Sequence, residues 1–239
     1  ITRRFQLILW NVYSFFVMYA NIDNFAPQKD ADITPEAELD RWISSELNQL
    51  IMDVDNDLEN YDPTSAGRRM EAFVDNLSNW YIRRSRRRFW KSENDSDKMA
   101  AYHTLYDCLV KFIKLLAPFM PFMAEEIYQN LVRLVNGEEP ESIHLSDFPT
   151  AERSKIDNEL SEVTRIVIKV CSLGRAARSS AGIKVRQPLS KVVVALKSKT
   201  EREGILNLKP QILEELNVKD VEITEDDSMM GKDGFIVSK

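Results

Sequence analysis

Apolar residues recur every three to four positions over most of the first 137 residues, which is the spacing of one face of an α-helix. Helix-start signals support this reading: Thr34 and Pro35 precede the second apolar segment, and Asp62 and Pro63 precede the third. The segments cover residues 7–20, 39–61, 70–81, 97–117 and 124–135. Helices of this length with short connections predict a helix bundle over residues 1–137.

The pattern changes after residue 137. Residues 138–153 contain two prolines and are expected to form a linker loop, and residues 154–188 to form a connecting basic helix. Beyond it, two β-rich stretches, residues 191–196 and 218–224, flank a helical stretch, residues 201–216. Residues 235–237 are a candidate third strand. We therefore expect a small, truncated βαβ-like subdomain over residues 189–239. The predicted fold class is mainly α, a helix bundle followed by a small α+β subdomain.

The apolar run from residue 7 to residue 20 is interrupted by Asn11 and Ser14. It is shorter than the roughly 18 residues that a membrane span needs and lacks a signal-peptide cleavage site, so no membrane anchor is predicted. The polar positions of this helix form one narrow stripe, made of Arg4, Asn11, Ser14 and Asn21. The stripe predicts a helix that is buried on most sides, either by the rest of this chain or by domains outside it. Because the first residue is Ile1 rather than Met, we expect a piece of a larger protein.

Composition narrows the chemistry. Only 7 of the 239 residues are glycine, which argues against a turn-rich all-β fold and against a glycine loop that cradles phosphate. The two cysteines, Cys108 and Cys171, and the two histidines, His103 and His144, have no zinc-ligand spacing. A reduced, cytoplasmic protein without a structural metal follows as an expectation.

The charge is distributed unevenly. The net charge is −6, yet residues 68–91 hold eight basic and two acidic residues, and residues 165–191 hold seven basic and no acidic residue. Two basic segments in an acidic body suit a protein that binds a polyanion through one chosen surface. The alternative is a solvated face whose arginines pair with the abundant acids, which is the more usual role of a charge run.

An uninterrupted third helix would carry its buried stripe onto Arg84 and Arg88. Because a buried, unpaired guanidinium is costly, either the helix bends near Ser78 or these arginines reach acids on neighbouring helices. We favour the bend. Five residues would then share one helix face: Trp80, Arg83, Arg84, Arg87 and Lys91. Phe89 and Trp90 would pack on another face. Arginine suits phosphate and tryptophan can stack on an unpaired base, although Trp80 on its own is more readily explained as a core residue.

Five motifs carry a resemblance to a known family. They are residues 39–48 (LDRWISSELN), 79–90 (NWYIRRSRRRFW), 116–127 (LAPFMPFMAEEI), 144–149 (HLSDFP) and 184–189 (KVRQPL). In order and spacing they resemble the part of isoleucyl-tRNA synthetases that follows the catalytic domain. The third and fourth motifs are shared with the valyl and leucyl members of class I, whereas the second and fifth together look like the isoleucine enzyme.

The resemblance implies an anticodon-binding helix bundle followed by the start of a C-terminal junction domain. It also implies an enzyme that joins isoleucine to its tRNA with ATP and Mg. The family's ATP-site motifs, HIGH and KMSKS, do not occur in these 239 residues, so we expect no catalytic residue, cofactor or metal here. The expected partners are the anticodon arm of tRNA(Ile) and the catalytic and editing domains of the same protein, with no membrane.

With the family in view, the basic segments become candidate RNA contacts. In the first segment we expect arginines and a lysine to hold phosphates of the anticodon arm, and Asn79 or Trp80 to reach its loop. The second segment would extend the contact. The candidate nucleic-acid-binding residues are Asn79, Trp80, Arg83, Arg84, Arg87, Arg88, Lys91, Arg175, Arg178, Lys184, Arg186 and Gln187.

Two other readings remain open: the corresponding module of a valyl or leucyl enzyme, and a helical scaffold whose basic face docks an acidic protein. Other chemistry is weaker. His103 and Cys108 lie among apolar residues, so a core histidine is favoured over a ligand or a Cys-His nucleophile. Glu125 and Glu126 are expected to be first-turn acids that favour the helix dipole.

Overall fold

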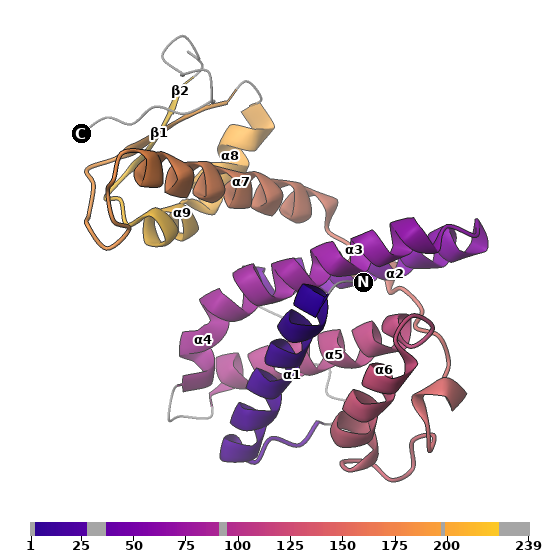
Figure 1. Cartoon of the computed structure of the whole chain (residues 1–239). Helices are drawn as coiled ribbons and strands as arrows, with labels where there is room; N and C mark the ends of the chain where they lie inside the picture. Colours follow the sequence, from indigo (N-terminus) through magenta and orange to yellow (C-terminus); the bar gives the residue numbers. More distant parts are fainter. Residues whose placement is uncertain (1–2, 28–36, 91–94, 197–198, 225–239) are drawn as a thin grey trace. The chain divides into compact units, whose positions relative to one another are not determined.

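The computed structural model describes residues 3–27, 37–90, 95–196 and 199–224, without the side chains of residues 199 and 200. The chain divides into two compact units, Ile1–Asp157 and Asn158–Lys239 (Figure 1). The first unit is helical, and the second combines helices with a small parallel sheet. The predicted fold class, mainly α with a helix bundle and a small α+β part, is confirmed.

The first unit contains the predicted bundle. Its α-helices are α1 (Arg3–Asp23), α2 (Glu38–Glu59), α3 (Pro63–Asn76), α4 (Arg83–Trp90), α5 (Ser96–Leu116) and α6 (Pro121–Tyr128). Two π-helical segments continue α3 and α6, η1 (Leu77–Ile82) and η2 (Gln129–Arg133), and two short 3₁₀ turns follow, η3 (Ile143–Leu145) and η4 (Arg153–Lys155).

Local capping explains where α3 and α5 begin. The side chain of Asp62 accepts a hydrogen bond from the backbone N–H of Ser65, and Pro63 occupies the first turn of α3, as predicted. Asp95 caps α5 in the same way by accepting from the N–H of Lys98 at 2.7 Å. The start expected at Thr34 and Pro35 lies outside the described residues.

Helix α1 supplies one side of the bundle core. Phe5, Leu9, Val12 and Phe16 are at most 3% exposed, and the ring of Phe16 lies against the rings of neighbouring aromatic residues on α5. The opposite face is open, since Leu7, Met18 and Ile22 are at least half exposed, so within the first unit α1 is buried on one side only. Among the described helices, α1 is long and apolar enough to cross a membrane, a test that core helices of soluble proteins also pass.

Residues 138–153, expected to form a linker, are held against the first unit by hydrogen bonds. The backbone N–H of Glu152 donates to Asn48 Oδ1 on α2 at 2.8 Å. Glu125 Oε2 accepts from Ser142 Oγ at 2.8 Å and from the N–H of Ile143 at 3.0 Å. Because α6 begins at Pro121, Glu125 lies beyond the first turn, so its expected role at the helix dipole is wrong: it anchors this loop.

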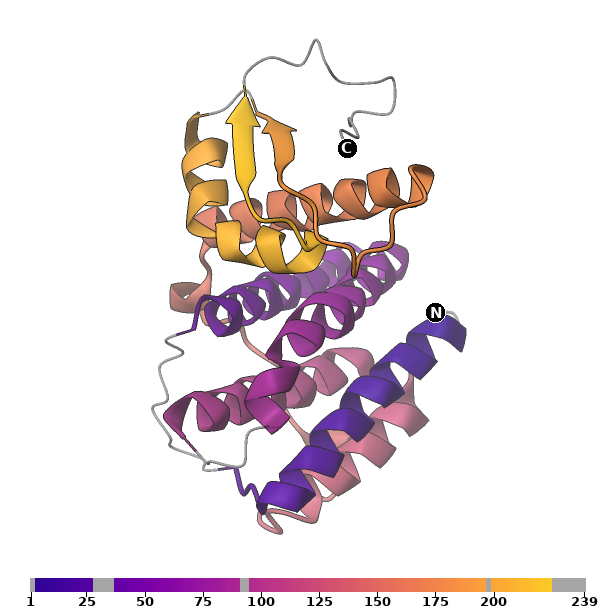
Figure 2. The ribbon, with the colours of Figure 1, turned by 90° about the vertical axis from the view of Figure 1, so that its left-hand side faces the viewer.

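The second unit contains α7 (Asn158–Ser180), β1 (Val192–Ala195), α8 (Lys199–Asn207), α9 (Lys209–Leu216) and β2 (Val221–Thr224). The strands pair in parallel with Val192 opposite Val221, and Figure 2 shows them side by side, so the predicted βαβ arrangement is present. Pro210 stands in the first turn of α9, and the helical connection is two helices rather than one. The candidate third strand at residues 235–237 lies outside the described residues.

Candidate nucleic-acid interface

The predicted interruption of the third helix is a π-helical segment, η1, which contains Ser78. In α3 the buried positions follow the normal helical period through Met70, Phe73 and Val74. A π-turn holds more residues than an α-turn, so the buried face of α4 falls on Ser85 and Phe89 instead of on positions 84 and 88. The shift takes Arg84 and Arg88 out of the centre of the buried face.

The same shift defines the exposed side. Five exposed residues recur at helical spacing along η1 and α4 and are named here the α4 basic face: Asn79, Arg83, Arg86, Arg87 and Trp90. The side chains of Arg86 and Arg87 form no hydrogen bond or ion pair with any of the described residues. The α4 basic face therefore offers cationic and aromatic groups to solvent within three helical turns.

The two tryptophans of this segment differ in exposure. Trp80, a candidate base platform that the sequence more readily explained as a core residue, is 3% exposed and belongs to the core, whereas Trp90, expected to pack internally, is 58% exposed. Arg84 was expected on the exposed face but lies partly buried, with its guanidinium 5.3 Å from the centre of the Trp80 ring. Arg86 and Trp90 are the residues that the sequence analysis missed, because their exposure depends on the extra residue in η1.

Arg88 forms an internal ion pair and does not face solvent as an RNA-binding residue would. Its two terminal nitrogens donate to the two carboxylate oxygens of Asp40 on α2, both at 2.6 Å. It also donates to the backbone carbonyl of Asp97 at 2.8 Å, and Tyr81 Oη donates to Asp40 Oδ1 at 2.8 Å. Asp40 is fully buried, so the arrangement satisfies a buried carboxylate from two sides. This corrects the prediction for Arg88: it reaches an acid on a neighbouring helix.

The electrostatics agree with that geometry. Burial alone would lower the pKa of Arg88, but its hydrogen bonds and charge interaction with Asp40 raise it above its ordinary value. Burial raises the pKa of Tyr81 well above 10, and the neighbouring Asp40 carboxylate adds to the rise. Arg88 is therefore charged and Tyr81 neutral at any physiological pH.

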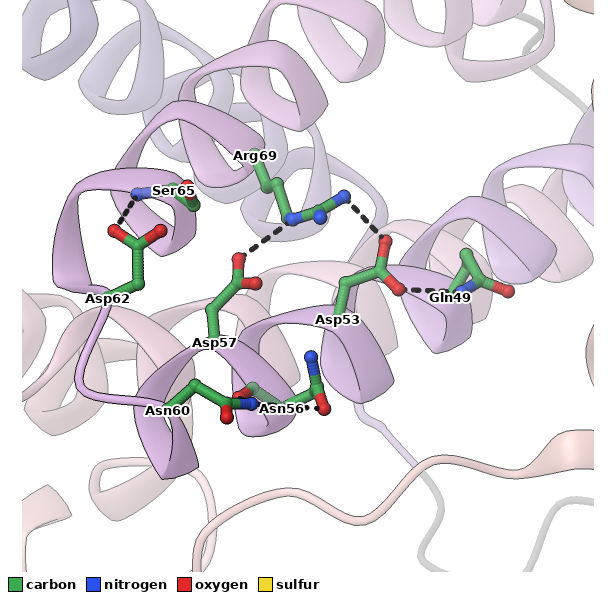
Figure 3. A network of polar contacts seen from close by, with 8 residues as sticks. All are labelled: Gln49, Asp53, Asn56, Asp57, Asn60, Asp62, Ser65 and Arg69. Carbon is green, nitrogen blue, oxygen red and sulfur yellow. Dashed lines mark hydrogen bonds and ion pairs between the residues drawn. The ribbon is translucent and has the colours of Figure 1, made fainter.

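Another arginine of the first basic segment, Arg69, is paired in the α2–α3 hairpin (Figure 3). Arg69 Nε donates to Asp57 at 2.8 Å and Arg69 Nη1 donates to Asp53 at 3.0 Å. Gln49 Nε2 holds the other oxygen of Asp53 at 2.8 Å. The charge run thus contains both kinds of arginine that the sequence left open, those paired with acids and those on an open face.

The second basic segment is mostly neutralised or buried. Arg175 pairs with Glu215 at 2.9 Å, Lys191 pairs with Glu222 at 2.5 Å, and Arg165 pairs with Glu162. Arg178 is only 4% exposed and burial lowers its pKa, so its predicted contact with RNA is corrected as well. Its guanidinium donates to four backbone carbonyls, those of Lys184, Gln187, Leu216 and Asn217.

The remaining candidates of this segment lie on the loop between α7 and β1. Lys184, Arg186 and Gln187 are exposed, and the side chains of the two basic residues have no hydrogen-bond or ion-pair partner among the described residues. Lys91 lies outside the described residues. Of the candidates, the structure therefore exposes Asn79, Arg83 and Arg87 together on one helix face and Lys184, Arg186 and Gln187 together on one loop.

Other candidate chemistry has a structural explanation. The His103 ring is packed edge-on against Phe25 at 5.0 Å between ring centres, and burial lowers its pKa. Cys108 is buried, and burial raises the pKa of its thiol well above 9, which leaves the unreactive protonated form at neutral pH. Among the residues that the structure describes, no group of three or more His, Cys, Asp or Glu side chains could hold a metal ion.

Comparison with known proteins gives a consistent result. The family model described as the anticodon-binding domain of tRNA ligases matches residues 40–194. An isoleucine–tRNA ligase of Dehalococcoides mccartyi is 58% identical over the whole chain, which covers 24% of that relative. The isoleucine–tRNA ligases of Clostridium novyi and Thermus thermophilus are 48% and 47% identical over 94% and 93% of the chain, which covers 21% and 22% of their lengths. The chain thus spans about a quarter of the length of these curated relatives, and the resemblance found in its motifs is confirmed.

Proposed function

The chain belongs to the anticodon-binding domain family of tRNA ligases, and we propose that it binds the anticodon arm of tRNA(Ile) as part of an isoleucine–tRNA ligase. The observation that carries the proposal is the α4 basic face. Arg69 and Arg88 of the same segment are paired with acids, whereas the side chains of Arg86 and Arg87 are exposed and have no acidic partner among the described residues. Guanidinium groups left available in this way suit phosphate oxygens, which they bind through two parallel hydrogen bonds.

The residues of the α4 basic face differ in which part of the RNA their side chains can contact. Arg83, Arg86 and Arg87 would contact phosphates and so set the position of the RNA, without reading its sequence. Trp90 offers an open ring on which an unpaired base of the anticodon loop can stack, and Asn79 offers an amide for a base edge. Because these side chains are spaced along one helix, they can contact successive nucleotides of a single RNA strand.

The Asp40–Arg88 pair supports the face from behind. It joins α4 to α2 and, through the carbonyl of Asp97, to the start of α5. A helix anchored on two neighbours presents its side chains in one orientation, which lowers the ordering cost when RNA binds. Lys184, Arg186 and Gln187 on the α7–β1 loop would add a second contact.

The remaining steps of the ligase reaction belong to the rest of the protein. We propose that ATP, Mg and isoleucine bind in catalytic and editing domains outside these 239 residues, and that this chain alone forms no isoleucyl-adenylate. The chain would contribute affinity and tRNA choice to an enzyme whose chemistry is performed elsewhere, in a cytoplasmic setting.

Titration with tRNA(Ile), tRNA(Val) and tRNA(Leu) transcripts over a range of salt concentrations tests the proposal. The unaltered chain is expected to bind tRNA(Ile) best, with log affinity falling linearly with log salt. Arg87→Glu should weaken binding and reduce the slope by about 0.7 to 0.9 for each phosphate that the variant no longer neutralises. A matched control is Arg153→Glu, which makes the same charge change at an exposed position on η4. Equal losses of affinity for the two variants, or no preference among the three transcripts, would contradict the proposal.

A further inference from the structure

Arg178 is a buried cation that no carboxylate among the described residues pairs with: all four of its hydrogen bonds go to backbone carbonyls. Its Nη2 donates to Leu216 at 2.6 Å and to Asn217 at 3.1 Å, at the C-terminal end of α9. The last carbonyls of a helix lack partners within it and form the negative end of the helix dipole. The end of α9 is thus a site where a buried guanidinium is stabilised.

The other nitrogen of Arg178 faces the α7–β1 loop. Nη1 donates to the carbonyl of Lys184 at 3.2 Å and to that of Gln187 at 3.0 Å. Within the loop the backbone N–H of Gln187 donates to the same Lys184 carbonyl at 3.0 Å, which closes a tight turn over residues 184–187. One side chain therefore fixes the two ends of this turn by their carbonyl groups.

Asn217 ties the same loop from a second direction. Its Nδ2 donates to the carbonyl of Val185 at 3.0 Å, and its own carbonyl accepts from the N–H of Leu189 at 3.1 Å. Asn217 adopts a left-handed conformation with φ 47°, which ends α9 and is tolerated by asparagine and glycine. Three carbonyls of the loop, those of residues 184, 185 and 187, are thus turned inward.

With the backbone turned inward, the side chains of the turn face solvent. Lys184, Arg186 and Gln187 are exposed. The side chains of Lys184 and Arg186 have no acidic partner among the described residues. Elsewhere in the same segment Arg165, Arg175 and Lys191 each have a glutamate. The exposed cations of this segment that have no acidic partner among the described residues are thus Lys169 on α7 and, next to each other on one loop, Lys184 and Arg186. The shape of that loop is set from inside by Arg178 and Asn217.

We infer that Arg178 is a positioning residue, which holds the turn over residues 184–187 so that Lys184 and Arg186 act as a second, preorganised phosphate-binding element. The inference rests on the proposed function, because it takes the ligand to be the phosphate backbone of tRNA. Its physical basis is that a loop already ordered before binding loses little conformational freedom when the phosphates arrive. Arg178 itself touches no RNA.

The test uses the whole 239-residue chain and a tRNA(Ile) transcript, titrated over a range of salt concentrations. The double variant Lys184→Ala/Arg186→Ala should weaken binding and reduce the salt slope by about 0.7 to 0.9 for each phosphate that is no longer neutralised. Arg165→Ala/Lys191→Ala is the matched control, since it removes the same charge from positions already paired with acids and should leave the slope nearly unchanged.

The positioning role is measured with two variants that leave both exposed cations in place. Arg178→Met should reduce the salt slope, and adding Lys184→Ala/Arg186→Ala to it should cause little further reduction. Asn217→Gly keeps the left-handed backbone, changes no charge and loosens only the tie to Val185, so a smaller reduction of the slope is expected even if Arg178→Met does not fold. Amide hydrogen exchange should be faster at Gln187 and Leu189 in Asn217→Gly, with Val194 unchanged.

The outcomes separate the two proposals. Fully additive losses of affinity for Arg178→Met and Lys184→Ala/Arg186→Ala would show that Arg178 acts independently of the loop and would overturn the inference. Binding that responds to Arg87→Glu but not to Lys184→Ala/Arg186→Ala would overturn the inference while the proposed function stands. If the unaltered chain binds no tRNA, both are overturned.

Discussion

Arg88 on α4 and Asp40 on α2, 48 residues apart in sequence, form a two-point ion pair with both N···O distances at 2.6 Å. The carboxylate is fully buried and also accepts from Tyr81 Oη. This relationship explains why an arginine-rich helix can pack on a hydrophobic bundle, since the arginine nearest the core is paired with a carboxylate there.

Removal of the acid from this pair should destabilise the first unit. Asp40→Ala leaves the largely buried Arg88 guanidinium with only the more exposed carboxylate of Asp97, 2.9 Å from Arg88 Nε. We therefore expect the free energy of unfolding to fall by about 3 kcal/mol, the lower end of the range for a broken buried pair. Asp53→Ala, which removes a partner of the more exposed Arg69, should lower it by no more than about 1 kcal/mol. Urea unfolding of both variants measures the difference. Similar losses of stability would show that the buried Arg88–Asp40 pair stabilises the first unit no more than the exposed Arg69–Asp53 pair does.

Asp23 should make stability sensitive to acid. Burial raises its pKa, but hydrogen bonds from Lys98 and Tyr102 outweigh burial, so the pKa lies below its usual value of 3.8. A carboxylate with a lowered pKa contributes stability that is present above pH of about 4 and is lost as the pH falls through the folded-state value. The chain should therefore lose stability as the pH falls below about 4.

Asp23→Asn provides the comparison. The variant should be less stable at pH 6, because the buried Lys98 loses its anionic partner, and should show a shallower loss of stability below pH 4. Urea midpoints at pH 6, 4 and 3 measure both effects. Parallel pH curves for the two proteins would mean that Asp23 has no part in the acid sensitivity.

Two glycines in the second unit should respond differently to a methyl group. A Cβ on Gly204 would lie 2.3 Å from Val163 Cγ2, and one on Gly174 would lie 2.5 Å from Leu216 Cδ1. Valine is stiff, whereas the end of a leucine side chain can rotate away. We expect Gly204→Ala to destabilise the unit by about 1 to 3 kcal/mol and Gly174→Ala by less.

Gly67→Ala serves as the control for these variants, because a Cβ there meets nothing within 4 Å and α3 should gain about 0.5 to 1 kcal/mol. Thermal unfolding followed by hydrogen exchange at β1 reports on the second unit. Equal effects of Gly204→Ala and Gly174→Ala would contradict the packing argument.

The two tryptophans should separate stability from RNA binding. Trp80→Ala removes a core side chain and should cost about 3 to 5 kcal/mol of stability. Trp90→Ala should leave stability nearly unchanged but weaken tRNA binding by about 1 to 3 kcal/mol with the same salt slope, since stacking involves no counterion release. Melting curves and tRNA titrations of both variants make the comparison. Unchanged affinity in Trp90→Ala would rule out base stacking on α4.

The two units should also differ in resistance to local opening. Residues 105–116 lie in the long core helix α5, whereas residues 192–196 lie in and beside a sheet of two short strands, which buries less apolar area. We expect amide exchange to be much slower in the first range. Equal protection of the two ranges would indicate a single cooperative unit.

Local sequence determined much of this fold. Asp62 and Pro63 mark the start of α3 because a cap and a fixed φ act within one turn, whatever surrounds the helix. The parallel strands were predictable for a similar reason, since β-branched residues on either side of a helical stretch favour one arrangement. The motifs in residues 79–90 and 184–189 carried the family.

Tertiary structure decided which members of those motifs are available. The extra residue in η1 is not encoded by any single position: it is stable because it places Trp80, Ser85 and Phe89 in the core together. That shift exposed Arg86 and Trp90, which helical periodicity alone could not indicate.

Long-range partners decided the rest. A basic run has the same composition whether its arginines meet phosphate or acid, and the acid that pairs with Arg88 lies on another helix. Arg178 has the sequence context of a surface cation, yet the four carbonyls that hold it are brought together only when α9 ends beside the α7–β1 loop. Sequence determines which groups are present, but burial and pairing arise from contacts between distant segments, because the energy of a buried charge depends on what surrounds it.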